Sequence, residues 1–271
     1  MDNVMDSVVE RPVAERVRTV LARGAAGSME TGMLRRPLRS ARVRDDGTVV
    51  LVVDVSGMSR EAGDAARVAS VGAAAAIEIV DSVCTGRCRG SAPRPSFALD
   101  GRRPGGAGQC DDECVVARGI VTLSGIVTAS SEARPRRLVA ADGVGAGREG
   151  EGPSLRLSEL QPLEITYVSA DGVHMIPRAE LAAAGVDLIG VDEQAWLRRL
   201  ASDPGLASRL ALRAGQQIAG TDPWVVGLDR CGVDLAIDFV GGGFRETVRL
   251  PFSQACRDSE DVTRELAALS G

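Results

Sequence analysis

The chain has 271 residues, enough for one large or two modest domains with a buried core. Hydrophobic residues make up 44% and charged residues 25% of the sequence, as in globular proteins, which excludes a largely disordered chain. The 32 cations and 37 carboxylates leave a net charge of −5. Without a basic surplus, we expect no nucleic-acid partner.

The composition excludes several catalytic chemistries. All cations are arginines, and the chain has one His, His174, and one Tyr. A Schiff-base enzyme and a Walker-type phosphate loop both need a lysine, so both classes are excluded. A zinc hydrolase with paired histidines is excluded as well. The carboxylates show no spacing that compels an acid/base assignment, and so the sequence names no catalytic residue.

The N-terminus has no basic patch followed by a long apolar run, and no stretch reaches the roughly 18 apolar residues of a spanning helix. We therefore expect a cytoplasmic protein with no membrane partner. In that compartment the six cysteines are expected to be thiols, metal ligands or redox switches and not permanent bridges.

The first 180 residues show mainly the alternation of β-strands. An apolar stripe after Pro12 predicts a helix over about 12–23. Alternating or β-branched runs predict strands, two of them as hairpin partners of their neighbours: 38–44 with 48–53, 73–80, 119–129, and 163–167 with 173–176. A further helix is expected at 59–70, and two Gly- and Arg-rich excursions are expected at 84–114 and 130–152.

From about residue 186 the pattern becomes helical. Trp196, Leu197 and Leu200 form one apolar patch, and Asp203 with Pro204 predicts the start of a second helix that carries Leu206, Leu210 and Ile218. A β-hairpin is expected over 227–252, with alternating residues on both sides of three glycines. A closing helix is expected from Asp258 or Ser259 to Leu269.

Two runs in this second part carry a resemblance to a known family. They are 227–235 (GLDRCGVDL) and 249–252 (RLPF), followed by an acidic helix. Together with the order of elements upstream, they resemble the HugZ-type haem-utilisation proteins of the pyridoxamine-phosphate-oxidase-like split-barrel family. The plant glutamyl-tRNA-reductase-binding protein has the same two-domain layout.

The resemblance implies an α+β fold, with an N-terminal split β-barrel over 10–180 and a small α/β domain over 186–271. It also implies a homodimer and a haem- or tetrapyrrole-handling protein with weak or no catalysis. Haem iron takes axial ligands such as His or Met, and so His174, beside Met175, is the candidate ligand. Where HugZ-like relatives often carry a histidine at the start of the small domain, this chain has Ser202-Asp203-Pro204.

Two alternatives stay open at this stage. Flavin binding in a split barrel, as in an FMN-dependent oxidoreductase, needs donors for the phosphate, and Arg35, Arg36 and Arg39 are the candidates. The second alternative is a regulatory protein with a protein partner. It rests on two Cys-x3-Cys pairs that flank the expected insertion: Cys84, Cys88, Cys110 and Cys114.

Four thiolates brought together suit tetrahedral zinc or an iron–sulfur cluster. Nearby arginines would lower the thiol pKa values and favour metal binding or oxidation. Metal binding, redox-switching pairs and idle thiols all remain possible for this loop. Cys231 and Cys256 are expected to be small core residues.

Overall fold

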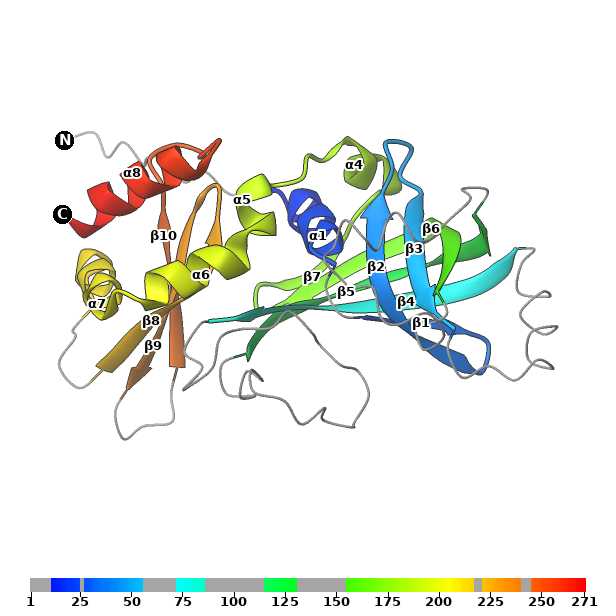
Figure 1. Ribbon diagram of the computed structural model, residues 1–271, viewed down its shortest axis with the longest axis horizontal. Helices are drawn as coiled ribbons and strands as arrows, with labels where there is room; N and C mark the ends of the chain where they lie inside the picture. Colours follow the sequence, from blue (N-terminus) through cyan, green and yellow to red (C-terminus); the bar gives the residue numbers. More distant parts are fainter. Residues whose placement is uncertain are drawn as a thin grey trace, which may run out of the picture.

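The computed structural model describes residues 11–24, 27–55, 72–85, 115–130, 155–216, 221–239 and 245–271. Figure 1 shows a β-barrel beside a smaller sheet that is covered by helices, with α1 (Val13–Ala22) between the two. The helix expected at 59–70 lies outside the described residues. So do the two excursions, except for Cys84, Thr85 and Ser130 at their edges.

The larger sheet contains seven strands, which are β1 (Gly27–Thr31), β2 (Leu34–Val43), β3 (Val49–Asp54), β4 (Ala73–Cys84), β5 (Val115–Ala129), β6 (Leu155–Ser169) and β7 (Gly172–Met175). Their order is β3-β2-β1-β4-β5-β6-β7, and an additional pairing of β3 with β6 closes a six-stranded barrel. β7 pairs antiparallel with β6 outside this closure. The barrel confirms the α+β split-barrel fold expected from the sequence.

The residues of these strands explain their positions. β3 is buried along its whole length, in keeping with its unbroken β-branched run, and pairs with β2 as predicted. β5 alternates, with Val121 and Leu123 fully buried. β1 was not predicted because its polar, Gly-containing run gives little strand preference. Gly27 suits that position, since a Cβ there would lie 2.6 Å from the carbonyl oxygen of Glu78.

The C-terminal part contains a three-stranded antiparallel sheet and several helices. The strands are β8 (Thr221–Asp229), β9 (Gly232–Phe239) and β10 (Arg245–Pro251), in the order β10-β9-β8. The helices are α5 (Leu188–Val191), α6 (Glu193–Ala201), α7 (Pro204–Arg213) and α8 (Ser259–Ser270). The preceding helix, α4 (Arg178–Ala183), packs on the barrel, and its Leu181 belongs to the barrel core. The predicted β9–β10 hairpin is present with register Leu235↔Val248.

One expectation for this region was incomplete. The hairpin predicted over 227–252 is part of a larger sheet, because β8 begins at Thr221 and supplies a third strand. Pro223 weakens the sequence pattern there, and proline is tolerated because β8 is an edge strand. In addition, α7 ends at Arg213, so that Ile218 is not on this helix as predicted; it lies outside the described residues.

Both predicted helix starts in this region are confirmed by their caps. The side chain of Asp203 accepts hydrogen bonds from the N–H groups of Gly205 and Leu206. The side chain of Asp258 does the same for Glu260 and Asp261 at the start of α8. Each cap satisfies two backbone donors that the helix itself leaves unpaired.

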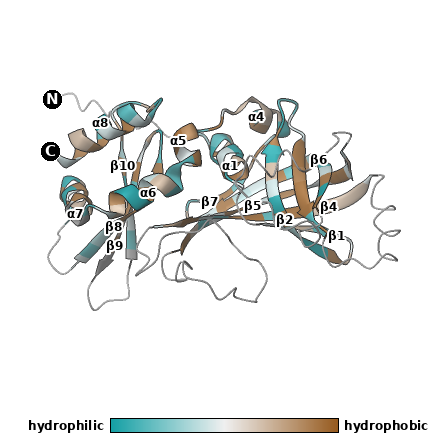
Figure 2. Cartoon of the chain, viewed as in Figure 1, coloured by the Kyte–Doolittle hydropathy of each residue, from teal (hydrophilic) through white to brown (hydrophobic). Residues whose placement is uncertain are grey.

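Two clusters of buried side chains stabilise the structure. One fills the barrel beneath α1, and the other lies between the small sheet and helices α6 to α8. Figure 2 shows hydrophobic residues along the barrel strands. Helices α6 and α8 carry both hydrophobic and hydrophilic residues, as expected of helices with one buried face. Cys231 and Cys256 are 1% and 3% exposed, which confirms them as core residues. The domain boundary near residue 186 stays a prediction.

Candidate functional site

His174 lies on β7, directly opposite Tyr167 of β6. Opposed residues of antiparallel strands point to the same face, and Tyr167 is buried in the barrel core. His174 is therefore half-buried on the inner side of β7. Its neighbours Val173 and Met175 point the other way, with 69% and 70% of their surface exposed.

Val173 belongs to a row of aliphatic residues on the outside of the barrel. Val80 pairs with Ile120, Ile120 with Val168, and Val168 with Val173, so that the row crosses four strands from β4 to β7. Ile120 and Val168 are 39% and 40% exposed. We call this row, together with Met175, the apolar face. The sequence analysis missed it, because it depends on the register of three strand pairs.

Beneath this region lies a group of buried charges, which we call the ionic cluster: Asp81, Glu193, Arg23 and Arg118. Asp81, on β4, is fully buried. Its Oδ1 accepts hydrogen bonds from Arg23 at 2.7 Å and Arg118 at 3.0 Å. Its Oδ2 accepts one from the hydroxyl of Tyr167 at 3.0 Å. Asp81 therefore joins α1, β5 and β6 from inside the barrel.

Glu193 connects the ionic cluster to the C-terminal part. It comes from α6 and accepts hydrogen bonds from Arg23 at 2.5 Å and from Arg118 at 2.6 and 2.8 Å. Its Oε1 also accepts the backbone N–H of Leu228 on β8 at 2.7 Å. The same two arginines are thus shared by a carboxylate of the barrel and a carboxylate that contacts the small sheet.

Neighbouring charges determine the pKa values of Asp81 and Arg118. Burial disfavours the charged form of Asp81, yet the positive charges of Arg118 and Arg23 outweigh it and hold the pKa of this carboxyl well below its usual range. Burial likewise opposes the charge of Arg118, but Glu193 and Asp81 raise its pKa. The pKa of Tyr167 is raised by burial and by the nearby Asp81. Asp81 and Arg118 are therefore charged at neutral pH, and Tyr167 is neutral.

The arginines predicted to bind a cofactor lie on β2, away from His174. Arg35 contacts Glu30 and Glu78, each at 3.5 Å, and Arg39 forms an ion pair with Asp54. Glu78 and Met175 share one row of the sheet register, three strands apart, which is about 15 Å. Arg36 also takes part in an interaction. The structure therefore does not bring these arginines next to His174.

Of the four cysteines predicted to bind a metal, the structure describes one. Cys84 is buried at the end of β4, and its backbone N–H and C=O both bond to the side-chain amide of Gln194 on α6, at 3.0 and 2.7 Å. Cys88, Cys110 and Cys114 lie outside the described residues. Within the described segments, no group of three or more His, Cys, Asp or Glu side chains is placed to hold a metal ion. Zinc or an iron–sulfur cluster here stays a prediction.

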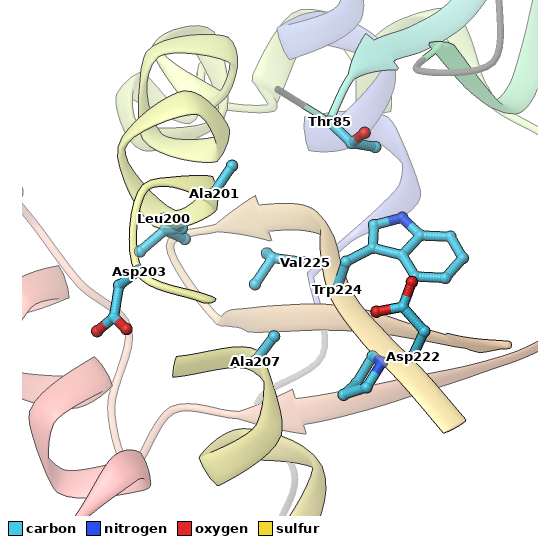
Figure 3. A pocket seen from close by; sticks show the side chains of 9 residues that line it. Thr85, Leu200, Ala201, Asp203, Ala207, Asp222, Trp224 and Val225 are labelled. Atoms are coloured by element: carbon cyan, nitrogen blue, oxygen red, sulfur yellow. The ribbon is translucent and has the colours of Figure 1, made fainter. Parts of the chain in front are cut away.

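A cavity of about 130 Å³ lies at the edge of the small sheet. Figure 3 shows Asp222 and Trp224 of β8 on one side of it and Asp203 on the other. Leu200, at the end of α6, adds an apolar wall. None of the described lining residues is a His, Cys, Met or Tyr, and the charged ones are carboxylates. This cavity therefore does not fit haem, which needs an axial ligand and cations for its propionates.

The edge strand β7 carries the axial-ligand types that the cavity lacks. His174 and Met175 are both ligand types that haem iron takes, and Met175 lies on the same side of β7 as the exposed aliphatic row, whereas His174 lies on the other side. The barrel interior is filled by the side chains of its own core. A haem group on the outside of the barrel, against the apolar face, would face Met175 and not His174.

Comparisons with known proteins give a similar fold and no relative by sequence. No protein-family model matches the chain, and no curated protein matches it. A solved structure of a heme binding protein from Mycobacterium smegmatis aligns with a TM-score of 0.53, covering 97% of this chain and 98% of that chain, at 19% sequence identity. The two chains share a fold.

A further solved chain aligns over 62% of this one with a TM-score of 0.34, which is too low to support an argument. The fold shared with the mycobacterial protein extends over the barrel and the C-terminal sheet, since the alignment covers almost all of both chains. Among the described helices, none is long and apolar enough to cross a bilayer.

Replacing Asp81 by Asn tests the ionic cluster. The variant leaves Arg23 and Arg118 with one carboxylate between them in a buried site, and breaking such a pair costs about 3–5 kcal/mol. We expect that loss in the free energy of unfolding at pH 7, measured with urea. The exposed Asp171→Asn variant is the control, with a change within about 0.5 kcal/mol.

The fall in the free energy of unfolding at acid pH gives a second test with the same variant. The pKa of Asp81 is lower in the folded state, so its contribution is complete above the unfolded pKa of about 4 and is lost as the pH falls below it. The native protein should therefore lose more stability than Asp81→Asn between pH 5 and pH 2. Equal acid sensitivity of the two proteins would contradict this role.

Proposed function

We propose that this protein binds haem or a related tetrapyrrole and is a distant relative of the HugZ-type haem-handling proteins. The observation that carries the proposal is the likeness along nearly the whole chain to a heme binding protein from Mycobacterium smegmatis. The two sequence runs at 227–235 and 249–252 support it independently, because they are the part of the sequence that resembles the HugZ type.

In this proposal either Met175 or His174 holds the group, and the apolar face shields it from water when Met175 is the ligand, because the two lie on the same side of β7. Bound haem would supply an iron that accepts an axial ligand from the protein. His174 can offer a ring nitrogen from the inner side of β7, and Met175 a thioether from the outer side. The two side chains point to opposite sides of β7, and so haem bound on one side can be held by only one of them. The variants of His174 and Met175 therefore show on which side haem binds.

We propose a handling role with weak or no catalysis. The apolar face consists of aliphatic side chains and Met175, none of which can accept or donate a proton in a reaction, and His174 lies on the other side of β7. The titratable groups of the ionic cluster lie inside the protein and are occupied by one another. These features suit binding, storage or delivery of a tetrapyrrole better than its cleavage.

Haem titration followed by absorbance tests the binding. We expect a saturable Soret band with the native protein. Loss or a shift of the band, with affinity at least about tenfold lower, is expected in either His174→Ala or Met175→Leu, because removal of the axial ligand changes the coordination of the iron.

Met33→Leu is the matched control for the methionine variant, because Met33 is fully exposed at the tip of the β1–β2 hairpin. Its spectrum should equal that of the native protein. A native protein without any Soret band would contradict haem binding. A band that both ligand variants leave unchanged would contradict the assignment to β7.

We also propose that the protein forms a homodimer through the apolar face. Four of its five residues are at least 39% exposed, and the row continues without a charged residue from Ile120 to Val173. A second copy packed there would remove this surface from water. It would also cover the side of a bound tetrapyrrole that one copy leaves open.

Light scattering after size-exclusion chromatography tests the dimer. Val173→Glu places a charge in the row at a position exposed enough to leave the fold intact, and should give a monomer because a buried unpaired charge is costly. Val186→Glu, at an exposed valine between α4 and α5, should leave a dimer. A native monomer, or a Val173→Glu dimer, would contradict this interface.

A further inference from the structure

Arg16, on α1, is a third arginine that contacts Asp81, and it differs from the two in the ionic cluster. That cluster is balanced by itself, because its two arginines face two carboxylates. Arg16 reaches Asp81 only through its Nε, at 3.4 Å, on the oxygen that already accepts the hydroxyl of Tyr167. Among the described residues, no other carboxylate lies within 4.0 Å of Arg16. Its positive charge therefore has no carboxylate of its own.

The guanidinium of Arg16 is also partly open to solvent. Its side chain is 28% exposed, and within the described segments neither of its Nη groups has a hydrogen-bond partner. Its Cζ lies 5.2 Å from the centroid of the Tyr167 ring, a distance at which an aromatic face attracts a cation. A guanidinium is a planar fork of N–H donors that matches the two oxygens of a carboxylate. Arg16 is thus positioned by a ring and one long bond, and its two outer nitrogens can bind an anion.

His174 lies on the same side of the sheet as this guanidinium. It is directly opposite Tyr167, and the Cβ atoms of opposed residues are about 5 Å apart, so His174 and Arg16 are both neighbours of Tyr167. Because β7 pairs with β6 outside the closed barrel, this side of β7 is not part of the filled barrel interior. The next row on this side consists of short residues, which are Gly119, Ser169 and Gly172.

Among the described residues, the rows on the other side of β7 offer no cation. Met175 shares its row with Thr166, Thr122 and Glu78, and the neighbouring row is the aliphatic one. The charged member of these rows is Glu78, which contacts Arg35. A carboxylate bound beside Met175 would therefore lose water without gaining a positive charge, which is unfavourable.

We propose that Arg16 binds a carboxylate of the tetrapyrrole and thereby selects the His174 side of β7. This inference rests on the proposed haem binding and decides between its two candidate ligands. Haem carries two carboxylates at one edge of its ring, so that its iron can face His174 while a carboxylate reaches Arg16. The bonds between a guanidinium and a carboxylate are stronger than those between neutral groups. The apolar face, on the opposite side of β7, would then serve the dimer contact alone.

The test compares haem with haem dimethyl ester, which has the same ring and iron but no carboxylate. Both are titrated in the same mild detergent and followed by the Soret band. We expect the native protein to bind haem at least about tenfold more tightly than the ester. Arg16→Gln should lower the affinity for haem by about tenfold and leave that for the ester unchanged, whereas Arg16→Lys should keep part of the preference because it keeps the charge. Arg213→Gln, at the exposed end of α7, is the matched control and should behave as the native protein. His174→Ala should alter the Soret band, and Met175→Leu should not.

Equal affinity of the native protein for haem and its ester would overturn the role of Arg16 and leave haem binding intact. An equal loss of affinity for both compounds in Arg16→Gln would overturn it as well, because such a loss does not depend on the carboxylates. A band altered by Met175→Leu and not by His174→Ala would overturn the choice of side. The absence of any band with the native protein would contradict haem binding itself, and this proposal with it. The comparison of the two compounds uses the native protein alone and stays decisive if Arg16→Gln does not fold.

Discussion

The ionic cluster of Asp81, Glu193, Arg23 and Arg118 is the interaction on which the arrangement of the whole chain depends. Each arginine bonds to a carboxylate of the barrel and to one of α6. Buried charges are stable only when they are paired and hydrogen-bonded. Because both arginines are shared, the loss of either carboxylate would leave both arginines without one of their partners. The barrel and the small sheet are fixed to each other by this requirement for mutual neutralisation.

The cavity at the small sheet and the strand pair proposed to bind haem are both connected to this cluster by hydrogen bonds. Glu193 holds the backbone of β8 at Leu228, and the next residue, Gln194, holds the end of β4 at Cys84. The cavity forms where these elements meet, between β8 and the helices that follow Glu193. On the barrel side, Asp81 bonds to Tyr167, which lies opposite His174 on β7. The same cluster thus supports the strand pair that carries the apolar face.

Parts of the fold could be predicted from sequence where a local pattern had only one physical solution. The β-branched run of β3, the Asp203 cap of α7 and the acidic start of α8 are of this kind. β1 and β8 were missed because their residues have weak strand preference, and their formation depends on pairing with distant strands. The glycine at 27 and the proline at 223 mark those positions only once the neighbours are known.

The candidate sites were less predictable than the fold. His174 was correctly placed on a short strand after a turn, since Asp171-Gly172 is a strong turn pattern. The apolar face could not be foreseen, because it requires the register of β4 through β7. The ionic cluster joins residues up to 170 positions apart, and in a chain whose cations are all arginines the identity of an arginine carries little information about its partner.

Amide hydrogen exchange with and without haem tests the central claim, that this fold binds a tetrapyrrole at β7. The account predicts that haem slows exchange in β5, β6 and β7 and leaves α7 and β10 unchanged, because ligand binding stabilises the elements that contact it. Unchanged exchange throughout the protein, or protection confined to the C-terminal sheet, would contradict it.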